Sequence, residues 1–166
     1  MRFGEFAKED LFCIETSKIY KNMGGGIKTV EFILKRKNRQ IIFLEAKTSC
    51  PNENRREESE EKARKFEEYF CDIADKFHDS LQIYLASLLR CYEDLSEVGS
   101  SLQETGEFGK NELKFILVIK NAKIEWLPGP QSILENKLRA LCKIWGAKVV
   151  VLNEELAAQH HFIATS

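Results

Sequence analysis

The sequence lacks several features that would assign it to a class at once. No apolar run approaches the length that spans a bilayer, so we expect no membrane-spanning helix. The net charge is −1, which excludes an overall positive field, and nucleic-acid binding would therefore need a local cluster of Lys and Arg. Neither Gly-Lys-Ser/Thr nor G-x-G-x-x-G follows the glycines at 24–26, which excludes the common phosphate-binding and dinucleotide-binding loops.

The cysteines do not show the spacing of a metal site. The five cysteines are widely spaced and form no C-x-x-C pair, so we expect free, mostly buried thiols and no zinc site. The charged start, MRFGEFAKEDL, does not resemble a secretory signal, and we expect a cytoplasmic protein. A length of 166 residues predicts a single domain, over residues 1–166, that can bury a hydrophobic core.

The most informative stretch runs from Gly24 to Pro51. Two apolar runs, Ile27–Leu34 and Ile41–Leu44, flank the polar segment KRKNR and predict a β-hairpin with its turn at Asn38, a residue type that tolerates positive φ. With that turn, residue i faces residue 76 − i, which places Glu31 opposite Glu45.

Side chains alternate along a strand, so Glu31, Glu45 and Lys47 are expected on one face. Two carboxylates that face each other among apolar neighbours repel, and burying both as anions is costly. A divalent cation between them would remove the conflict, and oxygen ligands suit Mg²⁺ or Mn²⁺. An ordinary ion pair between Glu31 and Lys47, without metal, is the simpler alternative.

Glu31 followed by Glu45-Ala46-Lys47 on the next strand resembles the active site of the PD-(D/E)XK nuclease superfamily. That resemblance implies metal ligation by Glu31, Glu45 and the carbonyl of Ala46, with Lys47 as a catalytic residue. It makes Glu15 a candidate for the upstream acid, against the alternative of a solvated glutamate, with Glu5 and Glu9 as weaker candidates. Val30 and Glu31 stand where that superfamily usually has Pro and Asp.

The rest of the chain predicts alternating helices and strands. A helix is expected over part of residues 3–21, with a further strand as an alternative at Leu11–Ile14. One long helix, or two, is expected over Arg55–Asp94, capped by Asn52 or Asn54. Then follow the loop 96–109, a strand at Leu113–Ile119, a break at Pro128-Gly129-Pro130, a helix at Gln131–Trp145 closed by Gly146, a strand at Lys148–Leu152 and a short helix at 153–160.

These elements predict an α/β fold, a mixed central sheet flanked by helices, in the order of a restriction-endonuclease-like core. The function that the resemblance implies is Mg²⁺-dependent or Mn²⁺-dependent hydrolysis of nucleic acid, with DNA the expected substrate. The alternative is an inactive module of the same fold that acts in protein assembly or nucleic-acid binding. The long helix favours a homodimer under either reading.

One dense basic cluster occupies the hairpin tip: Lys35, Arg36, Lys37 and Arg39. It could contact a distant phosphate of a nucleic acid, but it lies roughly 20 Å from the acids at ~3.3 Å per residue. We favour the simpler interpretation, a charged and solvated turn. The three histidines, His78, His160 and His161, are not spaced as a metal site.

Overall fold

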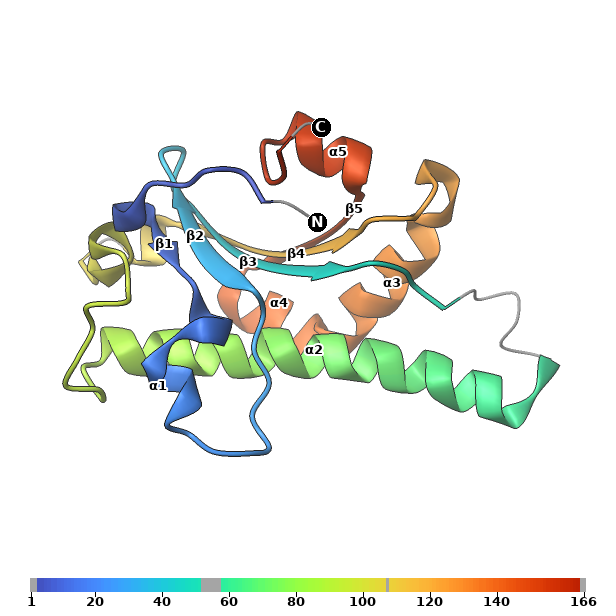
Figure 1. Ribbon diagram of the computed structural model, residues 1–166, viewed down its shortest axis with the longest axis horizontal. Helices are drawn as coiled ribbons and strands as arrows, with labels where there is room; N and C mark the ends of the chain where they lie inside the picture. The colour runs from blue at the N-terminus through green and yellow to red at the C-terminus, as the bar shows by residue number, and fades with distance from the viewer. Residues whose placement is uncertain (1–2, 52–57, 107, 165–166) are drawn as a thin grey trace.

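The computed structural model describes residues 3–51, 58–106 and 108–164. Its centre is a five-stranded sheet in the order β1-β2-β3-β4-β5 (Figure 1). The first three strands pair antiparallel, whereas β3 pairs parallel with β4 and β4 parallel with β5. The strands are β1 Leu11–Phe12, β2 Phe32–Arg36, β3 Gln40–Lys47, β4 Glu112–Ile119 and β5 Lys148–Asn153. The predicted α/β class, with a mixed sheet, is confirmed.

A single long helix, α2, crosses one face of this sheet (Figure 1). It spans Glu60–Leu88, and the Ser59 side chain caps it by accepting a hydrogen bond from the Lys62 backbone N–H. The predicted caps, Asn52 and Asn54, lie outside the described residues. Aromatic packing fills the layer beneath it, with the Phe115 ring 5.3 Å from Phe77 and 5.5 Å from Phe43.

The other helices cover both faces of the sheet. Helices α3 and α4 lie on the same side as α2, while α5 lies on the opposite side (Figure 1). On that side Phe162 belongs to a second apolar cluster, against which Phe3 and Phe6 pack. Phe3 also forms an isolated antiparallel β-bridge with Ile163. The α-helices besides α2 are α1 Lys18–Lys21, α3 Pro128–Lys137, α4 Arg139–Trp145 and α5 Glu154–Gln159; short 3-10 turns cover Lys8–Asp10, Ile14–Thr16, Ser100–Gln103, Phe108–Lys110 and Ile124–Trp126.

The hairpin forms in the predicted register, with Phe32 opposite Leu44. Its first strand starts later than predicted, at Phe32, because the preceding backbone bonds to α2. The Lys28 N–H donates to Asp79 at 3.0 Å, and the Val30 N–H donates to the Ser80 hydroxyl at 2.9 Å. The left-handed residue of the turn is Arg39, with φ 58°, not Asn38. A three-residue loop needs its positive φ at the last loop position.

Two further predictions were wrong in detail. Pro128-Gly129-Pro130 does not break the chain but forms the first turn of α3, where the missing proline N–H costs nothing. The predicted helix over 131–145 divides into α3 and α4 at Leu138, while Gly146 ends α4 in the left-handed conformation with φ 63°, as predicted.

The N-terminal region contains β1, short 3-10 turns and the short helix α1, so a helix does occupy part of residues 3–21, and the further strand is confirmed at Leu11–Phe12. All five cysteines are free, but Cys13, Cys71 and Cys91 are exposed rather than buried. Within the ranges that the structure describes, no helix is both long and apolar enough to cross a membrane.

Candidate functional site

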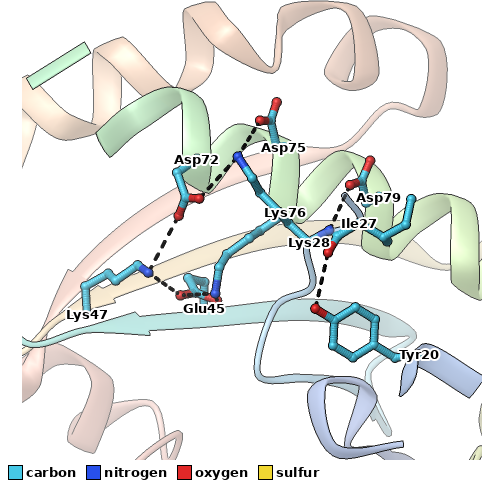
Figure 2. Close-up of polar contacts among 9 residues, drawn as sticks. All are labelled: Tyr20, Ile27, Lys28, Glu45, Lys47, Asp72, Asp75, Lys76 and Asp79. Atoms are coloured by element: carbon cyan, nitrogen blue, oxygen red, sulfur yellow. Dashed lines mark hydrogen bonds and ion pairs between the residues drawn. The ribbon is translucent and has the colours of Figure 1, made fainter. Parts of the chain in front are cut away.

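Strand β3 carries Glu45 on the face that packs against α2. Neighbouring positions on that face, Ile41 and Phe43, belong to the core, and Glu45 is itself only 1% exposed. A buried carboxylate needs compensating charge. Two ammonium groups supply it: Lys47 Nζ lies 3.2 Å from Glu45, and Lys76 Nζ of α2 lies 3.1 and 3.2 Å from its two oxygens (Figure 2).

The electrostatics of Glu45 follow from this setting. Burial raises the pKa of its carboxyl, and the charges of Lys76 and Lys47 oppose that rise without cancelling it. Burial lowers the pKa of Lys76, but the carboxylates of Glu45, Glu15 and Asp72 together outweigh this effect and raise it overall. The charges of Glu45 and Lys76 therefore favour each other in a place where burial disfavours both.

Glu31 precedes β2 by one residue, and its N–H donates to the Leu44 carbonyl at 3.1 Å. The hairpin register thus extends to Glu31 and points it toward the same face as Glu45. The pKa of Glu31 is raised to about 7, mainly by burial and further by the charges of Glu15 and Glu45 and a hydrogen bond with the Glu15 carboxyl, while the charge of Lys76 opposes the rise. Glu15 reaches this point from the 3-10 turn Ile14–Thr16.

Three carboxyl groups from distant parts of the sequence therefore meet at one end of the hairpin. Burial, and after it the charges of Glu15 and Glu45, disfavours the ionised form of Glu31, and a bound cation would relieve that cost. Carboxylate oxygens are also the donors that Mg²⁺ and Mn²⁺ prefer, so the residues present fit such an ion in kind. As they stand, the described residues include no group of three Asp, Glu, His or Cys side chains already arranged around one ion position.

Acidic side chains of α2 form ion pairs with Lys47 at the end of β3 and with Lys28 in the segment before β2. Asp72 lies 3.8 Å from Lys47 Nζ and 3.3 Å from Lys28 Nζ, and Asp75 lies 2.9 Å from Lys28 (Figure 2). Together with the backbone bond from Lys28 to Asp79, these contacts tie the segment before β2 to the helix. The position of Glu31 thus depends on α2 as much as on the hairpin.

Sequence reasoning missed Lys76 and Asp72. They lie four residues apart and flank the buried Ile73 and Phe77, so they stand at the edge of the buried face of α2. The sequence shows that both residues lie at the edge of the apolar face of the helix. It does not show which residues of the sheet they contact. The alternative of a Glu31–Lys47 ion pair does not describe the structure, because Lys47 pairs with Glu45 and Asp72 instead.

The basic cluster at the hairpin tip lies at the far end of β3 from Glu45, and much of its charge is engaged internally. Lys35 Nζ lies 2.7 Å from Glu104 and 2.8 Å from the Ser101 carbonyl. Arg36 stacks 4.2 Å from the Phe162 ring centroid and donates to the His160 carbonyl. Only Lys37 and Arg39 of the four are exposed, which favours the interpretation as a solvated turn.

No family model matches the chain, and neither a curated protein nor a solved structure shows significant similarity to it. The candidate site therefore stands on its residues and their geometry.

Proposed function

We propose that this chain is a metal-dependent nuclease of the PD-(D/E)XK type, built on a restriction-endonuclease-like core and acting on DNA. One observation carries the proposal. Glu15, Glu31, Glu45 and Lys47 come from three separate elements and gather on one face at the end of β3. An acid-x-Lys on the second hairpin strand, an acid across from it and an acid upstream is the arrangement that the resemblance predicts.

Under this proposal each residue of the site has a separate role. Glu31, Glu45 and the Ala46 carbonyl would hold Mg²⁺ or Mn²⁺, with Glu15 completing the set of oxygens. When bound, the ion supplies an acidified water and charge compensation at the phosphodiester. Lys47 would orient that water or hold the negative charge of the attacked phosphate, because its ammonium stands beside Glu45 with 28% of its side chain exposed.

Lys76 has a positioning role under this proposal. Its ammonium contacts both Glu45 oxygens, so it neutralises the carboxylate when no ion is present. Metal ligation by Glu45 would require at least one of those oxygens to turn from Lys76 toward the ion. The site is thus held charged and ordered before the ion arrives.

A second candidate function is an inactive module of the same fold, acting in assembly or in nucleic-acid binding. The observation that favours it is the same pair of lysines, because Glu45 already has its charge satisfied by Lys47 and Lys76. A homodimer through α2 and a cytoplasmic location stay predictions under both functions.

The test is a cleavage assay on labelled single-stranded and double-stranded DNA and on RNA, with Mg²⁺ or Mn²⁺. We expect the wild type to cut DNA and Glu45→Gln and Lys47→Ala to lose at least a hundredfold in rate, as removal of a stabilising group in a reaction centre does. Glu112→Gln is the matched control, because Glu112 pairs with Lys114 and Lys148 at the opposite end of the parallel strands. A folded wild type that cuts none of these substrates would refute the nuclease and favour the inactive module.

A further inference from the structure

A hollow lies at the carboxyl end of β3 and β4, close in the chain to Glu45 and Lys47. Its volume is about 530 Å³, and its walls come from the segment after β3, the segment after β4 and the start of α3. Among its lining residues are Ser49, Phe66, Asn121, Glu125 and Trp126. Small-molecule sites in proteins have volumes in this range.

The hollow is a neighbour of the candidate site. Ser49 follows Lys47, the last residue of β3, by two residues, which is at most ~7 Å at ~3.3 Å per residue. Tyr69 of α2 contacts this segment, because its hydroxyl donates to the Ser49 carbonyl at 3.0 Å. The Glu45 charge is also among the causes that raise the pKa of Tyr69, after burial and Cys50. A single sugar-phosphate unit can bridge this distance.

Among the described lining residues, the chemistry suits a flat, uncharged group better than a phosphate. Glu125 contributes negative charge, and neither Lys nor Arg is among the described residues that line the hollow. Phe66 is buried at its base. The Trp126 ring is 55% exposed, with Lys123 Nζ 5.2 Å from its centroid.

Such a set of groups can recognise a nucleobase. An aromatic ring offers a stacking surface to any base, and the Asn121 amide and Glu125 carboxylate can bond to a base edge. A base that is paired and stacked in a duplex cannot enter a hollow of this kind, whereas an unstacked base can.

We propose that this hollow, between Ser49 and Trp126, binds an unstacked nucleobase of single-stranded DNA whose adjoining phosphate lies at Glu45 and Lys47. The inference rests on the proposed nuclease function and names its substrate class. It assigns Trp126 as the stacking residue and makes single strands better substrates than duplexes.

The test uses Trp126 as its own reporter. Trp126 and Trp145 are the two tryptophans, so Trp145→Phe leaves Trp126 as the only source of indole fluorescence. A labelled single-stranded 12-mer is titrated into this variant without metal and with Ca²⁺, against the duplex of the same sequence. We expect the single strand to quench Trp126 with saturation, and the duplex to bind more weakly.

Affinity is then measured by anisotropy of the labelled strand. Loss of one stacking contact of 1–3 kcal/mol predicts that Trp126→Ala raises Kd by roughly 5-fold to 150-fold, and Trp126→Phe should restore most of the binding. Ile144→Ala is the control, because Ile144 is 72% exposed on α4 and does not line the hollow.

The outcomes separate this inference from the function on which it rests. Cleavage by the wild type with unchanged Kd and rate in Trp126→Ala overturns the base pocket and leaves the nuclease standing. Trp126-dependent binding without cleavage supports the pocket and counts against the nuclease. Binding without quenching, or no binding to the single strand under either condition, overturns the pocket.

Discussion

Glu31→Gln should stabilise the protein at high pH and leave it unchanged at low pH. The Glu31 pKa is raised from 4.5 to about 7, so the folded protein binds a proton there that the unfolded chain has already lost. Stability from this group is therefore fully present below pH ~4.5 and is lost as the pH rises through ~7. Glutamine is neutral throughout and avoids that loss, while its amide can still donate to Glu15.

The magnitude follows from the size of the pKa rise. At ~1.4 kcal/mol per pKa unit the rise from 4.5 to about 7 corresponds to at most ~3.5 kcal/mol. Glu31 is partly exposed, and solvent screening reduces the expected gain to about 1–2 kcal/mol at pH 8. For a chain of this length that is roughly 2–8 °C in Tm.

The assay is urea unfolding followed by circular dichroism at pH 5 and pH 8, without divalent cations. The exposed Glu93→Gln serves as control and should change stability by less than about 0.5 kcal/mol at both values. If Glu31→Gln is no more stable than the wild type at pH 8, the ionised Glu31 is not disfavoured by burial and by the charges of Glu15 and Glu45, and the basis of the cation site is lost.

Two further variants test how α2 holds the site. Lys76→Met removes one of the two ammonium groups that pair with the buried Glu45 carboxylate. We expect it to lower the free energy of unfolding in urea by about 3 kcal/mol at pH 8, and by less at pH 5, where Glu45 can take up a proton. An equal loss at both values would mean that only packing was removed. Ser80→Ala leaves the Val30 N–H without its acceptor and should cost about 1–3 kcal/mol. Ser87→Ala, whose hydroxyl only donates to a carbonyl of its own helix, should cost less, and the reverse order would contradict the role given to Ser80.

The hairpin could be predicted because residues close together in the sequence determine it. The short polar segment between two apolar runs fixes which residues face each other, and the register with Phe32 opposite Leu44 follows. Burial of Glu45 follows from its apolar neighbours for the same reason. The helix caps at Gly146 and the parallel pairing of β4 and β5 were likewise readable from turn chemistry and element order.

The contribution of α2 could not be predicted from the sequence. Its helical period shows which face is apolar, but the angle at which it crosses the sheet decides that Lys76 meets Glu45 and that Asp72 meets Lys47. The late start of β2 has the same origin, because Asp79 and Ser80 replace the strand partners of the preceding residues. The exposure of Cys13, Cys71 and Cys91, and the start of α3 at Pro128, likewise depend on how the elements pack.

The most direct test of the cation site is calorimetry with Mn²⁺ at pH 8. We titrate the ion into the wild type, Glu31→Gln, Glu45→Gln and the distant control Glu112→Gln. Saturable binding to the wild type and the control, lost in both site variants, is the result that the acid cluster predicts. Equal binding to all four proteins, or none to the folded wild type, would contradict it and leave Glu45 with Lys47 and Lys76 as a structural ion-pair network.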